Sequence, residues 1–182
     1  MLQESSAIFY RPKDKKLHAD KARASFVRQG GDHFTLLNVW EQWSDSNFSQ
    51  TFCYEQFLQY KVLSRVRDIR DQLAGLCDRV EVVIQSNPNA TDIVPIQKAL
   101  TSGYFYCTVR FFQVSVPSLR PDWDMNSSQA RLQKSGDSYR TMKTQQTVYI
   151  HPSSSLFQHQ PPPKCVLYYE LVMTSKSYMR YV

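Results

Sequence analysis

The stretch "VYIHPSSSLF", Val148 to Phe157, begins with the pattern of a β-strand and ends with that of a turn. Its first residues suit a half-buried strand, and Pro152 ends that strand because proline cannot donate to a strand ladder. The three serines that follow carry hydroxyls that cap turns. We therefore predict a strand of a small β-barrel that leaves through a capped turn.

The same stretch sets His151 beside three serines, Ser153, Ser154 and Ser155, and a histidine with serines is half of a nucleophilic site. Such a site also needs a group that orients the imidazole and donors for an oxyanion, usually on a G-x-S-x-G elbow. No glycine of this sequence stands in that pattern. A small Ser/His hydrolase is therefore only a third hypothesis.

A two-residue period, typical of strands, continues on both sides of this stretch. The expected strands are "YRTM" (139–142), "QTVYIHP" (146–152), and "KCVLYYELVMTS" (164–175) leading into "SYMRYV" (177–182). Residues 107–138 show no sustained period, and a segment of that length without structure is unusual in a compact domain. We expect a linker or insertion there.

The first half of the chain has the residue pattern of helices. Helices are predicted at 15–28, 32–43, 52–60, 61–80 and 92–106. Gly30-Gly31 is a stop signal, Asp32 is a predicted N-cap, and Thr91 or Asp92 caps the last helix with Pro95 in its first turn. Helices followed by short strands predict an α+β fold or two domains.

The helix predicted at 61–80 has the clearest periodicity in the chain. Its apolar stripe is Leu63, Val66, Ile69, Leu73, Leu76, Cys77 and Val80. Arg65 and Arg70 fall at the edges of the stripe, and Arg67 points away from it. The arginines form surface ion pairs, Arg65 with Asp68 and Arg67 with Asp71, or they line a channel for a phosphate backbone.

The net charge of +6 is concentrated in the second part of the chain. Residues 1–107 carry 13 Lys and Arg against 12 Asp and Glu, whereas residues 108–182 carry 9 against 4. Six tyrosines share that basic part: Tyr139, Tyr149, Tyr168, Tyr169, Tyr178 and Tyr181. This composition suits a surface that binds a polyanion and stacks its bases, or equally a basic surface around a tyrosine-rich core.

Several classes of function and location are disfavoured by what the sequence lacks. Its four cysteines are widely spaced and its histidines have no ligand spacing, so we expect reduced thiols inside a cell and no metal site. No P-loop is present, so the chain cannot bind ATP by that motif. There is no secretion signal and no long apolar run, so we expect no membrane partner.

Six segments in order resemble the C-terminal region of the spliceosomal DEAH-box RNA helicases. They are "FYRPKDKKLHADKARASF", "GGDHFTLLNVWEQW", "FCYEQFLQYKVLSRVRDIRDQL", "IQKALTSGYFY", "YRTMKTQQTVYIHPSSSLF" and "VLYYELVMTSKSYMR". The resemblance covers residues 8–107 and 132–182. The first two segments are most similar to the member that acts before the first catalytic step of splicing.

The resemblance implies an architecture. Residues 1–12 would end a winged-helix region or linker, and 13–107 would form the helical ratchet-like, helicase-associated domain. Residues 108–136 would be an atypical insertion, and 137–182 an OB-fold β-barrel. The family continues past the position of Val182 into a further strand, so we expect an incomplete barrel with an unpaired edge.

The resemblance also implies a role. The chain would be the RNA-gripping part of an ATP-dependent helicase acting in pre-mRNA splicing in the nucleus, within the spliceosome and under a G-patch activator protein. ATP and Mg²⁺ would belong to the parent helicase, with no cofactor, metal or catalytic residue in this chain. Its expected contacts with single-stranded RNA are Arg65, Arg67, Arg70, Arg140, Lys143, His151 and Lys176.

Two features depart from the family and leave alternatives open. About twenty residues near 107–128 match nothing in it, and they are either a lineage-specific loop or translated intron sequence. The ATPase motifs are absent, which we attribute to a start downstream of them. The alternatives are a stand-alone RNA-binding or protein-interaction module, and a relative acting at another splicing step or in ribosome biogenesis.

Overall fold

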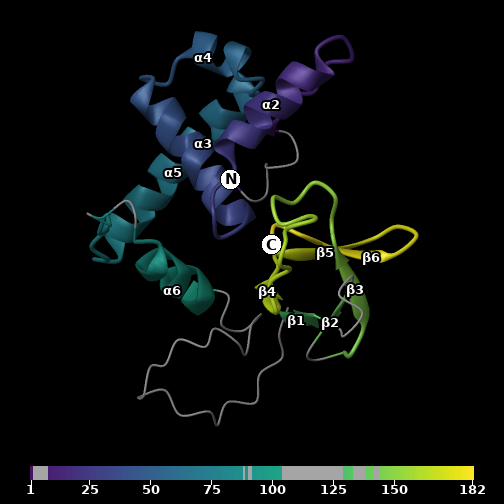
Figure 1. Ribbon diagram of the computed structural model, residues 1–182. Coiled ribbons are helices and arrows are strands. Elements are labelled where there is room, and N and C mark those ends of the chain that lie inside the picture. The colour runs from purple at the N-terminus through teal and green to yellow at the C-terminus, as the bar shows by residue number, and fades with distance from the viewer. Residues whose placement is uncertain (2–7, 88, 90–91, 104–128, 133–137, 142–143) are drawn as a thin grey trace. The chain divides into compact units, whose positions relative to one another are not determined.

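The computed structural model describes residues 1, 8–87, 89, 92–103, 129–132, 138–141 and 144–182 (Figure 1). The chain divides into two compact units, Met1–Pro88 and Asn89–Val182. The first, here called the helical unit, contains helices α2 to α5, and the second, the barrel unit, contains α6 and all the described strands. The predicted α+β class is confirmed.

The helical unit contains four of the five predicted helices. They are α2 (Lys16–Phe26), α3 (Asp32–Asp45), α4 (Gln50–Glu55) and α5 (Tyr60–Arg79). Their order and approximate positions agree with the sequence pattern. The differences lie at their ends, where contacts from distant residues compete with the helix.

The start of α3 corrects one prediction. Asp32 is the first residue of the helix, and Gly31 occupies the N-cap position with a φ of 101°. Gly30 has a φ of 108°, and a Cβ built on it would lie 2.6 Å from the ring of Phe34. Both positions therefore require glycine, and Asp32 places its charge in the first turn, where the helix dipole favours it.

The core of the helical unit is built around Trp43, which is fully buried. Its indole Nε1 donates a hydrogen bond to the carbonyl of Ser49 at 3.3 Å, so its polar atom is satisfied. Its ring packs edge-on against Trp40, Phe48 and Tyr60. The remaining members of the buried cluster are Ile8, Phe26, Leu36, Val39, Cys53, Leu58 and Leu63.

Helix α4 is shorter than predicted because the chain after it pairs with the N-terminal segment. Ser49 caps the helix by accepting a bond from the N–H of Phe52 at 3.3 Å. Leu58, predicted to be helical, instead forms an isolated antiparallel bridge with Phe9. Two backbone hydrogen bonds of 2.8 Å flank this bridge, so α4 ends at Glu55.

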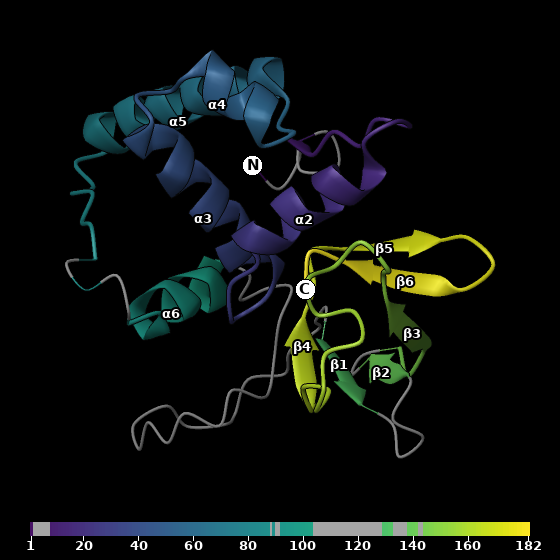
Figure 2. The same cartoon turned by 45° about the horizontal axis from the view of Figure 1, so that its top comes forward.

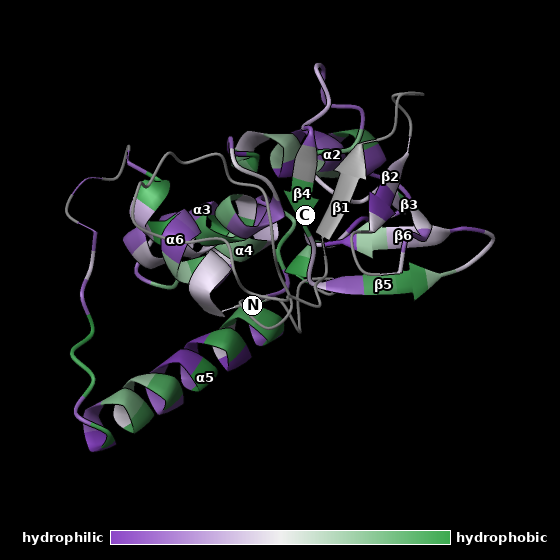
Figure 3. Cartoon of the chain, turned by 90° about the horizontal axis from the view of Figure 1, so that it is seen from below, coloured by the Kyte–Doolittle hydropathy of each residue, from purple (hydrophilic) through white to green (hydrophobic). Residues whose placement is uncertain are grey.

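Helix α5 carries the predicted apolar stripe, but only its first part is buried. Leu63 and Val66 are in the core. Leu73, Leu76 and Val80 are 56%, 49% and 68% exposed. Figure 3 shows the hydrophobic residues continuing along the length of α5. Among the described residues, no helix is long and apolar enough to cross a membrane.

The barrel unit is a six-stranded sheet in the order β4-β1-β2-β3-β6-β5 (Figures 1 and 2). The strands are β1 (Gln129–Leu132), β2 (Tyr139–Thr141), β3 (Thr147–Ile150), β4 (Cys165–Leu167), β5 (Glu170–Met173) and β6 (Ser177–Arg180). All neighbouring strands are antiparallel except β3 and β6, which run parallel. The predicted strand at 164–175 is divided into β4 and β5 by Tyr168-Tyr169.

Both ends of this strand order come from one stretch of the chain. Its two terminal strands, β4 and β5, are consecutive parts of one segment, Cys165–Met173. β4 pairs with β1 and β5 pairs with β6. The segment 108–136, which was expected to be an insertion, contains the strand β1, and this strand pairs with both β2 and β4.

The barrel has its own buried cluster, separate from that of the helices. It consists of Tyr139, Val148, Val166, Tyr168, Met179 and Val182. Helix α6 (Val94–Gly103) precedes the strands. As predicted, Asp92 caps it, accepting from the N–H of Val94 at 3.0 Å, and Pro95 lies in its first turn. Thr91 and the expected boundary at Cys107 lie outside the described residues.

Candidate nucleic-acid interface

One outward face of the barrel carries basic and aromatic side chains from three neighbouring strands. Along β2, Tyr139 and Thr141 are buried and Arg140 is exposed. Arg140 stands opposite Thr147 of β3, and Tyr149, two residues further on, therefore lies on the same face. Tyr149 in turn pairs with Tyr178 of β6. We call Arg140, Tyr149, His151, Lys176 and Tyr178 the outer face.

Four of the five side chains of the outer face, all but that of Arg140, are linked by contacts that involve the two tyrosine rings. The rings of Tyr149 and Tyr178 are 6.1 Å apart, and the His151 ring meets Tyr178 edge-on at 5.7 Å. The Nζ of Lys176 lies 4.5 Å from the centre of the Tyr149 ring, a cation–π contact. Both tyrosines and His151 are half-buried. The face thus combines cations with aromatic rings, as single-strand binding requires.

The strand and turn predicted from "VYIHPSSSLF" are both present. Ser154 donates its N–H to the carbonyl of His151 at 2.9 Å, and its hydroxyl accepts from the N–H of Leu156 at 3.2 Å. Ser153 contacts the imidazole Nδ1 of His151 through both its hydroxyl, at 2.7 Å, and its N–H, at 3.1 Å. The serines are turn-capping residues, as expected.

The six tyrosines of the basic part have different environments. Tyr139 and Tyr168 are only 2% and 6% exposed, and Tyr139 donates its hydroxyl to the carbonyl of Pro163 at 2.9 Å. These two rings belong to the core and cannot stack on a ligand. Tyr169 and Tyr181 form a second half-buried pair, with ring centres 6.0 Å apart. Composition alone could not distinguish these core and half-buried tyrosines from Tyr149 and Tyr178 of the outer face.

The predicted arginines of α5 are not equivalent. Arg65 is exposed, whereas the guanidinium of Arg67 lies 5.5 Å from the centre of the Phe48 ring and that of Arg70 lies 5.6 Å from that of Trp40. Arg67 was expected to point away from the stripe. It instead covers an aromatic ring that packs on the core.

The ion pairs of α5 also differ from the expected pattern. Arg67 is paired with Asp68 at 3.8 Å and not with Asp71, which lies 3.9 Å from Arg70. Both distances are close to the limit for an ion pair, and all four side chains are at least 37% exposed, so the pairs contribute little to stability. The aromatic contacts are the better explanation for where these two arginines lie.

The structure thus brings together three of the seven predicted contact residues, Arg140, His151 and Lys176, in the outer face. Tyr149 and Tyr178 join them and were not among the predicted contacts. Their signal was present in the sequence as alternation within two strands, but their pairing depends on the parallel register of β3 and β6. Lys143 lies outside the described residues.

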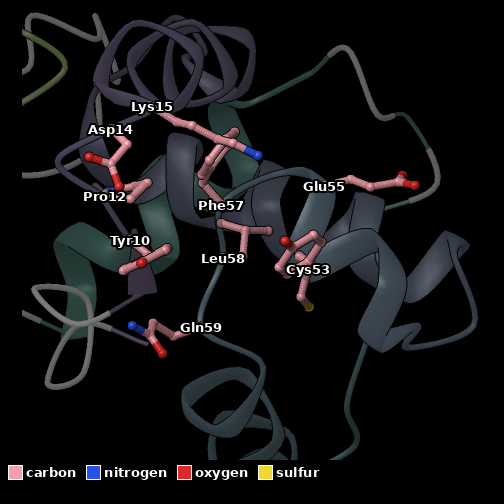
Figure 4. Close-up of a pocket in the computed structure, with 10 residues that line it drawn as sticks. Tyr10, Pro12, Asp14, Lys15, Cys53, Glu55, Phe57, Leu58 and Gln59 are labelled. Carbon is pink, nitrogen blue, oxygen red and sulfur yellow. The ribbon is translucent and has the colours of Figure 1, made fainter.

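A separate cavity of about 530 Å³ lies in the helical unit, between the segments Tyr10–Lys15 and Cys53–Gln59 (Figure 4). Its lining mixes the charged side chains of Asp14, Lys15 and Glu55 with apolar ones. Burial raises the pKa of the Cys53 thiol to about 11, so this thiol is not a nucleophile near neutral pH. No local pattern in the sequence indicated this cavity.

Metal chemistry has no candidate site within the part of the chain that the structure describes. No group of three histidine, cysteine, aspartate or glutamate side chains is arranged there to hold an ion. Cys53 and Cys77 are free thiols. The chemistry that the outer face can perform is binding, through cations for phosphates and rings for bases.

The comparison with protein families agrees with the topology of the barrel. Residues 96–182 match the model of the oligonucleotide/oligosaccharide-binding (OB)-fold family, and this match spans all six strands and most of α6. The six-stranded sheet with one parallel pair is consistent with that assignment. Residues 96–182 are therefore similar to an OB-fold family that is associated with the C-terminal region of helicases.

Proposed function

We propose that this chain is the RNA-gripping C-terminal part of a DEAH-box ATP-dependent RNA helicase that acts in pre-mRNA splicing in the nucleus. The observation that carries the proposal is the outer face of the helicase-associated OB-fold, where Arg140, Lys176 and a tyrosine pair lie together. The helical unit before the barrel fits the ratchet-like domain that the resemblance implies.

The outer face suits a single strand held without regard to its sequence. Arg140 and Lys176 would neutralise phosphates, and Tyr149 and Tyr178 would stack on bases, because every base has a π-face. Arg65 on α5 would add a phosphate contact from the helical unit. These residues do no bond-breaking chemistry, so their task is to hold RNA while the parent enzyme moves it.

ATP and Mg²⁺ would act on the ATPase lobes of the parent helicase, where hydrolysis drives movement along RNA in the 3′-to-5′ direction. The spliceosome and a G-patch activator would be partners of that parent enzyme. The transcript tests this part of the proposal, because the message must encode a P-loop and a DEAH box upstream of these codons. A complete message without them would leave a stand-alone RNA-binding module.

RNA binding is tested with the double variant Arg140→Gln/Lys176→Gln. Binding of a fluorescent twelve-nucleotide uridine oligomer is measured by anisotropy between 25 and 200 mM salt. Each phosphate contact to a single strand contributes roughly 0.7 to the slope of log K against log salt, so two lost contacts should flatten the slope by about 1.4. Affinity at low salt should fall for any RNA sequence.

The control is Lys13→Gln/Lys21→Gln, which removes the same charge from two exposed lysines of the helical unit. This control variant should show only the effect of the lower net charge on RNA binding. Most of the slope of log K against log salt should remain. If the two double variants have equal slopes, the outer face is not the phosphate site. If the unmodified chain shows no binding at 25 mM salt, the RNA function itself is wrong.

A further inference from the structure

The turn after β3 determines the hydrogen-bonding state of the His151 ring. The backbone N–H of Ser153 donates to Nδ1 of His151 at 3.1 Å, and the Ser153 hydroxyl lies 2.7 Å from the same nitrogen. A backbone N–H can only donate, so Nδ1 must offer its lone pair. A neutral imidazole has one N–H, which must then be on Nε2.

The same contacts disfavour the charged ring. An imidazolium carries hydrogens on both nitrogens, so its Nδ1–H would face the Ser153 N–H, donor against donor. The hydroxyl of Ser153 could turn and accept, but the backbone N–H cannot. The turn is therefore arranged for the neutral ring with its proton on Nε2.

The ring is also held in place on the outer face. The N–H of His151 donates to the carbonyl of Met179 on β6 at 3.0 Å, which anchors the backbone at the end of β3. The imidazole then meets the ring of Tyr178 edge-on, beside the Tyr149–Tyr178 pair. His151 thus stands next to the rings on which a base would stack.

We propose that Ser153 is a positioning residue that holds His151 in the neutral Nε2–H tautomer, and that His151 contacts RNA as a hydrogen-bond donor and not as a cation. This rests on the proposed function of the outer face. The ligand group is an acceptor oxygen of single-stranded RNA, either a phosphate oxygen or a 2′-hydroxyl. A DNA oligomer of matching sequence separates the two, because only a 2′-hydroxyl contact is lost with DNA.

The tautomer is tested on the full ¹⁵N-labelled chain without RNA. Long-range ¹H–¹⁵N spectra of the imidazole distinguish an Nε2–H ring from an Nδ1–H ring and from an averaged one. We expect the Nε2–H pattern in the unmodified chain and in Ser153→Ala and Ser153→Thr, which keep the backbone N–H, and a shift toward averaging in Ser153→Pro, which lacks it. Ser102→Ala, on an exposed residue of α6, is the control and should change nothing. An Nδ1–H or fully averaged ring in the unmodified chain would overturn the proposal.

The contact is tested by three substitutions of His151 and by Ser153→Ala, with anisotropy against the uridine oligomer. The amide nitrogen of glutamine reaches the position of Nε2, whereas that of asparagine reaches only the position of Nδ1. His151→Gln should bind within about twofold of the unmodified chain and His151→Asn about fivefold more weakly, since one neutral hydrogen bond is worth on the order of 1 kcal/mol. Ser153→Ala should bind about threefold more weakly, because one of the two bonds that hold the ring is lost.

The outcomes separate this inference from the proposed function. If His151→Lys binds as well as the unmodified chain while the glutamine and asparagine variants are equally weak, the ring acts as a cation and the inference is wrong. If all His151 variants bind equally, the ring makes no contact, and the RNA function survives on Arg140 and Lys176. If neither the unmodified chain nor any variant binds RNA, both the RNA contact of His151 and the proposed RNA function are wrong. Only the NMR spectra of the imidazole then test the role of Ser153.

Discussion

At the scale of single residues, three arginines with the same charge on one helix have different roles. Arg67 and Arg70 lie over Phe48 and Trp40 at cation–π distance, and both rings pack against the core of the helical unit. Arg65 is exposed. We propose that any phosphate contact from α5 is made by Arg65, because Arg67 and Arg70 lie over the aromatic rings beneath them.

This assignment predicts that substitution of Arg67 or Arg70 lowers stability, whereas substitution of Arg65 weakens RNA binding. Arg67→Gln and Arg70→Gln should each lower the free energy of unfolding of the helical unit by about 0.5–1 kcal/mol, the value of an exposed cation–π contact. Arg65→Gln should change it by less than ~0.5 kcal/mol and should weaken RNA binding. Urea unfolding, followed by tryptophan fluorescence, measures the free energy of unfolding.

Lys61→Gln, on the same helix and also exposed, is the matched control for loss of one charge. If Arg65→Gln destabilises the helical unit as much as Arg70→Gln does, the cation–π contacts are not what distinguishes these residues. If Arg65→Gln binds RNA as Lys61→Gln does, α5 contributes no specific phosphate contact.

At the scale of elements, α5 shows that one amphipathic pattern can be buried in part. The apolar residues recur at steps of three and four along its whole length, but only Leu63 and Val66 are buried. The helix forms because its residues have good helix propensity and its first turns pack on α3 and α4 residues such as Trp43 and Cys53. Leu76 remains 49% exposed within the described structure.

Two identical substitutions on α5 test this difference. Leu63→Ala removes a fully buried side chain and should cost about 2–5 kcal/mol of unfolding free energy. Leu76→Ala should cost less than ~0.5 kcal/mol, since alanine keeps the helix and little burial is lost. Urea unfolding of the full chain by tryptophan fluorescence compares them. An equally large loss for Leu76→Ala would mean that the second part of the stripe is covered in solution.

At the scale of the whole molecule, the chain forms two units with separate buried clusters. The helical cluster is centred on Trp43, and the barrel cluster on Val148 and Met179, both of which are fully buried. The two clusters share no residue. Substitutions in one cluster should therefore be additive with substitutions in the other.

Met179→Ala tests this separation. It should destabilise the barrel by about 2–5 kcal/mol, because it leaves a cavity between β3, β5 and β6. Hydrogen exchange followed by mass spectrometry should show faster exchange in peptides of β3 and β6 and unchanged exchange in α3. Val39→Ala, a fully buried residue of α3, is the reciprocal control. Equal loss of protection in both units after either substitution would show that the chain unfolds as one cooperative body.

Much of the local structure followed from the sequence by itself. The helices at α2, α3 and α5, the cap at Asp92, the strands β2, β3 and β6, and the serine-capped turn after His151 were all predicted. These features depend on periodicity, proline and capping hydroxyls, which act between residues close in the chain. The basic and aromatic character of the second part also required no structure.

Tertiary contacts decided the rest, because they join residues that are distant in the chain. β1 has no convincing pattern of its own and is a strand because β2 and β4 supply its hydrogen bonds. The packing of the barrel buries Tyr139 and Tyr168, and the parallel register of β3 and β6 sets Tyr149 beside Tyr178 on the outer face. The sequence thus determined which elements form and their chemical character, and only the register of the paired strands decided which side chains of the barrel can meet a ligand.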